Sequence, residues 1–355
     1  MPTTARLVPI LLGIICAILV LAAFYFADAI IAPVACALFI IAIAWPLQER
    51  LQTRLPQLLA LAIVVTLVVL VFIVFASVVA WGFGRVGRSL IAEMPRLQLL
   101  YEQAAAWLET HGVTVAGLWA EHFDMRWVVG AMQGLSVRLN TMISFWIVVL
   151  IYVLLGLLEV GPLARKIPGI VSGEAARILI VGGELTAAKL RRYLWIRTIM
   201  SVATGAMVYV FALALGLQLA TEWGVIAFTL NFIPFVGPFI ATFLPTFYAL
   251  AQFESLYSAL FVFVCLNVIQ FAIGSYVEPR VAGRALALSP FLVLFSVFLW
   301  MFLWGLFGAF IGVPIAIAVL TFCAQSPSTR WIAHLLGSPD DEMESDARIL
   351  GHRTF

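Results

Sequence analysis

Residues 223–251 read WGVIAFTLNFIPFVGPFIATFLPTFYALA, an apolar stretch long enough to cross a bilayer but broken near its middle by Asn231, Pro234, Gly237 and Pro238. Prolines in this arrangement prevent a continuous helix and leave backbone amides and carbonyls without helical partners. Such a backbone persists at membrane depth only where protein buries it or a wet cavity borders it. Half-helix ends at a break also present partial charges that transport sites use. A simple proline kink and a loop at the bilayer edge are the alternatives.

The composition of the whole chain indicates a membrane protein. Of 355 residues, 64% are hydrophobic and 11% are charged, and the mean hydropathy is +1.11. Soluble domains are roughly 45–50% apolar and about 25% charged, so a soluble fold could not cover this apolar surface. A net charge of +2 gives no basic field for nucleic acid. The four cysteines are far apart, so we expect no metal site, no disulfide framework and no cofactor.

Apolar runs of about 20 residues predict an all-α polytopic protein with about eight transmembrane helices. The runs are 7–27, 29–46, 58–81, 143–158, 199–220, 223–251, 256–276 and 291–322. The last run is also interrupted, at Gly305, Gly308 and Pro314. The pattern leaves open whether 223–251 and 291–322 cross the bilayer or form re-entrant segments.

Charged segments between these runs give the domain organisation. The parts are N-terminal transmembrane helices in 1–81, an extracytoplasmic amphipathic helical segment in 82–142, a transmembrane helix in 143–158, a cytoplasmic basic amphipathic linker in 159–197, a C-terminal transmembrane core in 198–325 and a cytoplasmic tail in 326–355. Basic residues accumulate on the cytoplasmic side of bacterial membranes, which sets this orientation. The basic linker suits an anionic leaflet, and an ordinary linker helix is the alternative.

A polar stripe is predicted in the seventh run. It consists of Asn267, Gln270, Gly274 and Glu278, spaced i, i+3, i+7 and i+11 on one helix face. Polar groups are costly against lipid, so this face is expected to look into the bundle or a cavity. Glu278 is the candidate coupling carboxylate or solute contact. The alternative is a structural ion pair with Arg280 or Arg284.

The two interrupted runs resemble each other. Trp223-Gly-Val-Ile leads into the first break, and Trp304-Gly-Leu-Phe leads into the second. Paired interrupted segments are typical of transporters built from repeats, although two short matches can also arise by chance.

Three motifs in the C-terminal half together resemble the signature of the autoinducer-2 exporter family of permeases: IP-x-x-GP, VEP-x-x-x-G-x-x-L-x-L-x-P and WG-x-x-G-x-x-x-x-x-P. The matching residues are Ile233, Pro234, Gly237 and Pro238; Glu278, Pro279, Gly283, Leu286, Leu288 and Pro290; and Trp304, Gly305, Gly308 and Pro314. The resemblance implies an inner-membrane protein of about eight spans, without an ATPase domain, that exports small polar molecules such as autoinducer-2. Some relatives resemble cation/proton antiporters. Relatives tend to carry an uncharged polar residue where this chain has Arg197.

We therefore expect a permease that moves a small polar solute, driven by a proton or sodium gradient because no GxxxxGK[ST] loop is present to bind ATP. The predicted translocation site comprises Asn231, Pro234, Gly237, Pro238, Asn267, Gln270, Glu278, Gly305, Gly308 and Pro314. Small residues in the last run also suit close helix packing in a homo-oligomer. The alternatives are a cation/proton antiporter and a non-transporting scaffold that binds a partner through 82–141. An intramembrane enzyme is disfavoured because HExxH and GxSxG motifs are missing.

Overall fold

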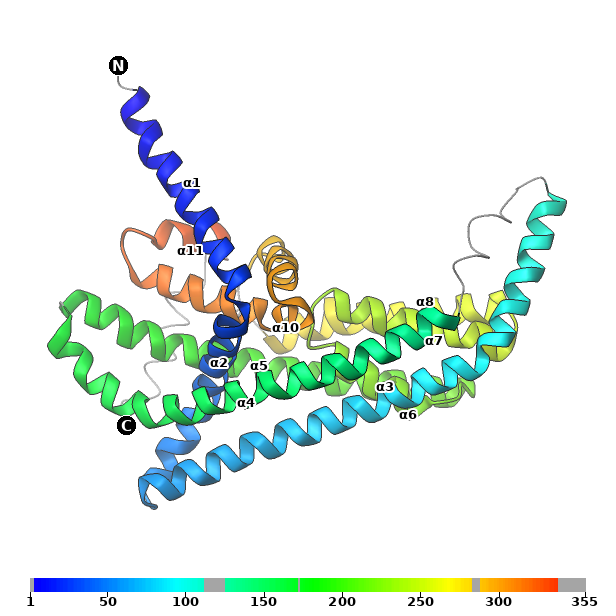
Figure 1. Cartoon of the computed structure of the whole chain (residues 1–355), viewed down its shortest axis with the longest axis horizontal. Coiled ribbons are helices and arrows are strands. Elements are labelled where there is room, and N and C mark those ends of the chain that lie inside the picture. The colour runs from blue at the N-terminus through cyan, green and yellow to red at the C-terminus, as the bar shows by residue number, and fades with distance from the viewer. Residues whose placement is uncertain (1–2, 112–124, 172, 283–287, 338–355) are drawn as a thin grey trace. The chain divides into compact units, whose positions relative to one another are not determined.

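The computed structural model describes residues 3–111, 125–171, 173–282 and 288–337, and in these ranges it is almost entirely helical (Figure 1). The elements are α1 (Thr3–Phe26), α2 (Asp28–Gln52), α3 (Gln57–Thr110), α4 (Met125–Ile170), α5 (Gly173–Leu215), α6 (Ala220–Leu230), α7 (Val236–Phe253), α8 (Leu256–Ala272), the π-helix η1 (Ile273–Val277), α9 (Glu278–Ala282), α10 (Pro290–Gln325) and α11 (Arg330–Leu336). The all-α prediction is confirmed.

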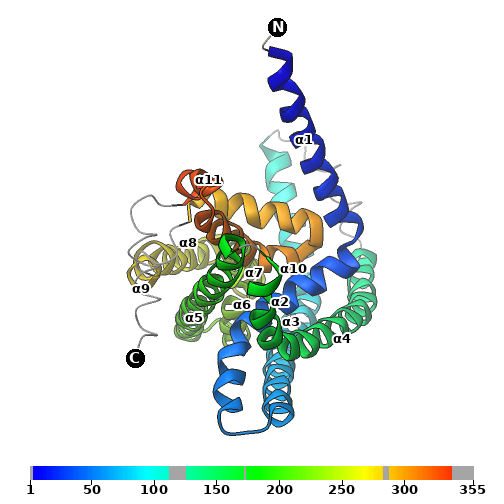
Figure 2. The same cartoon turned by 90° about the vertical axis from the view of Figure 1, so that its left-hand side faces the viewer.

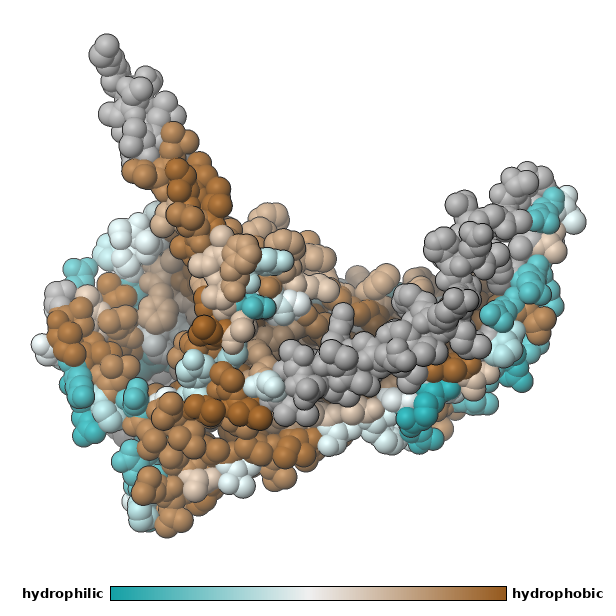
Figure 3. Space-filling view, viewed as in Figure 1, coloured by the Kyte–Doolittle hydropathy of each residue, from teal (hydrophilic) through white to brown (hydrophobic). Residues whose placement is uncertain are grey.

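Seven of these helical segments are long and apolar enough to cross a membrane, and Leu11–Phe26 is a shorter apolar helix. The expectation of about eight membrane helices is therefore confirmed. Large apolar side chains are exposed along them, as at Leu58, Phe239 and Phe302, which suits lipid as the surrounding solvent. Figure 3 shows this apolar surface along the described part of α1, whereas the C-terminal part of α3 carries hydrophilic side chains.

Three helices continue through boundaries at which the sequence analysis divided the chain, and α4 passes both the 142/143 and the 158/159 boundary. α3 passes Gly82 without a break and contains Pro95. α5 runs from Gly173 through Arg197 to Leu215, so the basic segment and the following span form one helix. Charged residues at helical spacing do not end a helix, which requires a cap, a glycine or a proline. The membrane side of each segment stays a prediction, and residues 112–124 and 338–355 lie outside the described part of the chain.

The chain divides into two compact units, each described by itself. Unit 1 comprises 1–65, 145–191 and 287–355, and unit 2 comprises 66–144 and 192–286. Each unit contains one of the two interrupted apolar segments. In both cases the interruption produces a helical hairpin.

The hairpin of unit 2 consists of α6 and α7. α6 has 11 residues, so it is about 16 Å long and too short for a hydrocarbon core of about 30 Å. The two helices pack against each other after a short connection. A side chain at Gly237 would overlap the backbone carbonyl of Leu230, so only glycine allows this close approach.

The hairpin of unit 1 lies within α10. Trp304 (φ −128°, ψ 16°) and Gly305 (φ 66°, ψ −149°) leave the helical conformation. A Cβ at Gly308 would overlap the carbonyl of Trp300, and one at Gly312 would lie 2.8 Å from the carbonyl oxygen of Ser296. Later residues thus face progressively earlier ones, which means that the two arms are antiparallel, and Figure 2 shows the ribbon turning back.

Candidate functional site

One face of α5 in unit 2 carries an unusual row of polar side chains. Tyr193, Arg197, Ser201 and Thr204 are spaced i, i+4, i+8 and i+11 and therefore lie along one face. Ser201 and Thr204 are fully buried, and Tyr193 is 7% exposed. The Thr204 hydroxyl donates to the Met200 carbonyl of its own helix. Buried polar groups in a membrane helix indicate a functional face.

The hairpin break contacts this face through Asn231. The Asn231 side chain is buried, and its amide nitrogen donates a hydrogen bond to Ser201 Oγ over 3.2 Å. Asn231 directly follows the last residue of α6. The predicted break residue is thereby held against the middle of α5.

The turn that follows is strained. Val236 N–H donates to the Pro234 carbonyl over 2.7 Å, which closes a γ-turn centred on Phe235 (φ 62°, ψ −55°). This conformation is rare for a residue with a side chain and costs of order 1–3 kcal/mol. After the turn, Gly237 N–H donates to the Ile233 carbonyl, and the Pro238 carbonyl accepts a hydrogen bond from the Thr242 hydroxyl.

Glu278 also contacts the polar face of α5. Arg197 Nη1 lies 3.3 Å from Glu278 Oε1 and 3.4 Å from Oε2. The side chains are 13% and 30% exposed. The sequence analysis weighed Arg280 and Arg284 as ion-pair partners of Glu278. Arg280 is exposed, and Arg284 lies outside the described residues.

The predicted polar stripe of the seventh run is divided by the π-helix η1. A π-turn contains an additional residue, so it rotates everything that follows relative to α8. Asn267 is exposed on this chain, and its amide donates to the Phe263 carbonyl of its own helix over 2.8 Å. Gln270 is half-buried and Gly274 is exposed. Glu278 therefore contacts the polar face of α5, whereas Asn267 takes no part in that contact.

Two predicted site residues thus meet the same helix, one turn apart. Asn231 contacts Ser201, and Glu278 contacts Arg197, four residues earlier; this spacing corresponds to a rise of about 6 Å. The sequence analysis singled out Asn231 and Glu278 but missed the row on α5. Its helical spacing was the signal that could have identified it.

Three buried polar atoms of α5 and α6 have unused hydrogen-bonding capacity. In the part of the chain that the structure describes, Arg197 Nε, Tyr193 Oη and Thr229 Oγ1 are buried without a hydrogen bond of normal geometry, and the Tyr193 hydroxyl interacts electrostatically with Arg197. Buried polar atoms normally find partners, and exceptions call for an explanation such as a ligand or ordered water. The arrangement can accept a polar molecule. No group of three or more His, Cys, Asp or Glu side chains suited to a metal ion occurs among the described residues.

The predicted site residues of α10 belong to unit 1, where two tryptophan rings pack at the break. The rings of Trp300 and Trp304 are 4.4 Å apart between centroids, and Trp304 Nε1 donates to the Phe24 carbonyl over 3.0 Å. Gly308 and Pro314 are buried. This hairpin is therefore stabilised by aromatic packing.

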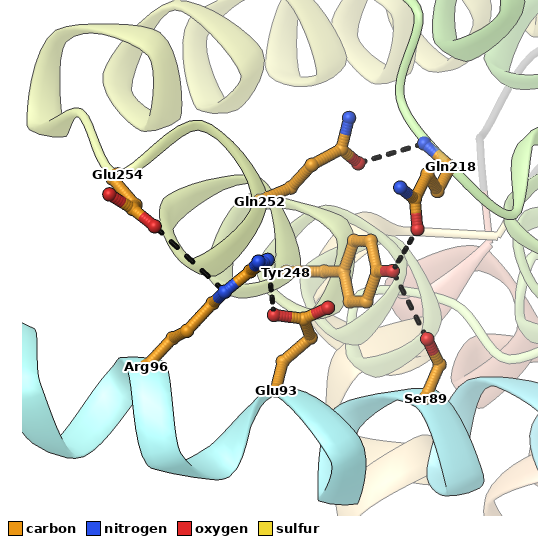
Figure 4. A network of polar contacts seen from close by, with 7 residues as sticks. All are labelled: Ser89, Glu93, Arg96, Gln218, Tyr248, Gln252 and Glu254. Atoms are coloured by element: carbon orange, nitrogen blue, oxygen red, sulfur yellow. Dashed lines mark hydrogen bonds and ion pairs between the residues drawn. The ribbon is translucent and has the colours of Figure 1, made fainter.

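A second polar network, which the sequence analysis did not identify, lies at the base of the α6–α7 hairpin (Figure 4). Tyr248 is fully buried, and its hydroxyl contacts Ser89 Oγ (3.1 Å) and Gln218 Oε1 (3.0 Å). Gln252 Oε1 accepts from the Gln218 backbone N–H. Arg96 of α3 pairs with Glu93 at 3.0 Å. The network ties α3 to the base of the hairpin.

Comparisons with known proteins agree with this architecture. The family model described as "AI-2E family transporter" matches residues 14–328. The "AI-2 transport protein TqsA" of Escherichia coli (strain K12) is 28% identical over 335 residues, which are 94% of this chain and 96% of that protein. A "Putative transport protein" of Haemophilus influenzae is 25% identical over 350 residues, which cover 93% of this chain and 97% of the relative.

A third relative matches a shorter stretch. A "Putative transport protein" of Borreliella burgdorferi is 33% identical over 129 residues, which cover 36% of each chain. The family model spans most of the sequence and the long apolar helices agree with it, so the chain belongs to the AI-2E transporter family and is a multi-pass membrane transporter, not an enzyme.

Proposed function

We propose that this chain exports a small polar solute across a bacterial inner membrane along the polar face of α5, between Asn231 and Glu278. The observation that carries the proposal is the contact of the hairpin break with α5 through Asn231 and Ser201. Non-helical backbone beside buried polar side chains is how membrane proteins border a polar passage.

The first candidate solute is one of the autoinducer-2 type. The named relative from Escherichia coli is an AI-2 transport protein that aligns with this chain over nearly its full length. Uncharged polar molecules suit a face on which hydroxyl, amide and paired ionic groups lie together. The bacterial origin of the relatives supports an inner-membrane location.

The driving force and the assembly are also proposals. The sequence analysis expected a proton or sodium gradient to act through Glu278, both in an exporter and in the cation/proton antiporter alternative. Any such ion must compete with Arg197, which already contacts both carboxylate oxygens. A homo-oligomer stays a prediction from the small residues of the last run.

The test compares two asparagines. Asn231 is buried at the break, whereas Asn267 is exposed and bonded within its own helix. Cells that lack other exporters of this signal would express the wild type, Asn231→Leu or Asn267→Leu, and external autoinducer-2 would be measured at equal membrane expression. We expect export to fall at least about tenfold in Asn231→Leu only. Export that is equal in all three, or equal to that of cells without the protein, would reject the proposal.

A further inference from the structure

The contact between Arg197 and Glu278 has the geometry of a bound cation. One nitrogen, Nη1, lies nearly equidistant from the two carboxylate oxygens, at 3.3 and 3.4 Å. A bidentate carboxylate ligand presents both oxygens to a bound cation such as Ca²⁺ in the same manner. The guanidinium therefore occupies the position in which a coupling ion would neutralise Glu278.

The Arg197 guanidinium is a permanent cation inside the protein. A guanidinium does not deprotonate in proteins, so the pair is neutral without any ion from solution. A sodium ion or a proton that neutralised Glu278 would leave the Arg197 charge unpaired while its side chain is 13% exposed. Removal of one partner from such a pair is strongly unfavourable, because the remaining charge has lost both water and its counter-ion. A cation from solution therefore binds Glu278 at a disadvantage, because it must displace the tethered guanidinium of Arg197.

The surroundings hold Arg197 in place. Its guanidinium carbon lies 5.8 Å from the centroid of the Tyr193 ring, within the range of cation–π attraction. Ile196, Met200 and Ile273 form a buried apolar cluster beside it. Among the residues that the structure describes, the ionisable groups near Glu278 are Arg197 and Tyr193 of α5 and the exposed Arg280 of α9. A large displacement of Arg197 would break both the ionic and the aromatic contact.

We propose that Arg197 is the built-in counter-cation of Glu278, so that this transporter binds an uncharged, oxygen-bearing solute and moves it without a coupling sodium ion or proton at Glu278. Arg197 Nε and Tyr193 Oη are buried without a hydrogen bond of normal geometry in the described part of the chain, and these donors suit hydroxyl or carbonyl oxygens of the solute. A solute that is made continuously inside the cell leaves down its own gradient. The class of solute rests on the proposed function, whereas the role of Arg197 as the counter-cation of Glu278 does not depend on it.

The experiment measures cation-driven proton movement in proteoliposomes that contain a trapped pH-sensitive dye. Sodium, lithium or potassium chloride replaces choline chloride outside at constant ionic strength. We expect wild type to match protein-free vesicles. Arg197→Gln exposes Glu278 to solution cations, so it should give cation-dependent proton flux that is lost in the double variant Arg197→Gln/Glu278→Gln. Arg280→Gln removes an exposed positive charge two residues from Glu278 and should match wild type.

Two flux results overturn the proposal: cation-driven flux in wild type that Glu278→Gln abolishes, and folded Arg197→Gln without any cation response. The thermal stability of the detergent-purified protein gives a second readout. Sodium in place of choline should raise the melting temperature of Arg197→Gln by about 2 °C and leave wild type unchanged. If Arg197→Gln does not fold, a sodium shift in wild type that Glu278→Gln removes still overturns the proposal, and its absence supports it.

Autoinducer-2 flux is measured in the same vesicles. Its absence, together with the expected cation results, would contradict the proposed solute and leave the role of Arg197 supported.

Discussion

The α6–α7 hairpin of unit 2 and the α10 hairpin of unit 1 are closed in the same way but differ at their tips. In each, a glycine shortly after the break faces a backbone carbonyl of the first arm: Gly237 faces Leu230, and Gly308 faces Trp300. At the first tip, Asn231 binds Ser201, whereas at the second, Trp304 packs on Trp300 and bonds Phe24. Similar closure with different tip chemistry indicates that hairpin geometry is a structural requirement, while polar recognition belongs to the first hairpin.

The turns differ in strain as well. The first hairpin places Phe235 at φ 62°, and the second places Gly305 at φ 66°. Glycine adopts such a conformation without steric cost, whereas phenylalanine does not. Strain persists where the surroundings enforce it, often in segments that change conformation. We therefore expect the α6–α7 tip to be the part that rearranges during transport.

The largest expected effect tests the close approach of a glycine to a backbone carbonyl that both hairpins share. Gly237→Ala and Gly308→Ala each place a Cβ against a backbone carbonyl that cannot move aside cheaply. Each should lower the free energy of unfolding by about 3 kcal/mol, measured as a lower melting temperature in detergent. Gly183→Ala is the control, since nothing lies within 4 Å of its Cβ. Equal stability of all three proteins would show that the hairpins close differently from the structure described above.

The next effect tests the difference in strain. Gly305→Ala should destabilise the protein by about 2 kcal/mol, because φ 66° with ψ −149° is essentially a glycine conformation. Phe235→Gly should have the opposite sign. Relief of about 1–3 kcal/mol of strain exceeds the entropic cost of glycine, about 0.5–1 kcal/mol.

Phe235→Gly should also transport more slowly if strain at the tip assists its rearrangement. Melting temperature and solute flux are measured together for both variants. A Phe235→Gly protein that is less stable than wild type would show that the backbone of Phe235 stores no significant strain.

A smaller effect tests the polar contact. Ser201→Ala removes the acceptor for the Asn231 amide and leaves a buried donor unpaired, which should cost about 1–2 kcal/mol. Solute flux should fall roughly tenfold, since the break loses its attachment to the proposed path. Thr198→Ala is a matched control outside the polar row, because the Thr198 hydroxyl donates to the Leu194 carbonyl of its own helix. Equal solute flux in the two variants would show that transport does not need the contact between Asn231 and Ser201.

The smallest effect tests the aromatic tip. Trp304→Phe keeps an aromatic ring but removes the N–H that donates to the Phe24 carbonyl. The loss should be about 1 kcal/mol in stability, and flux should stay close to wild type. A strong fall in flux with intact folding would mean that the α10 tip also takes part in recognition.

The parts of the site that sequence reasoning reached are those with a local cause. Asn231, Pro234 and Gly237 stand out because prolines and a polar residue interrupt an apolar run, and the break is found there. Glu278 stands out because a carboxylate at the end of a span needs a partner. The polar stripe was less successful, since its helical spacing assumed a regular helix through a segment that forms a π-turn.

By itself, the sequence determined that the chain is an all-α membrane protein and where its helices are interrupted. Hydropathy and proline chemistry act over one helix or less, so they can be evaluated along the chain. Only the tertiary structure decided that Arg197 pairs with Glu278, 81 residues away, and that Ser201 receives Asn231, 30 residues away. Such pairs depend on which helix faces are packed together, and this is the outcome of many weak contacts over the whole unit rather than of any local pattern.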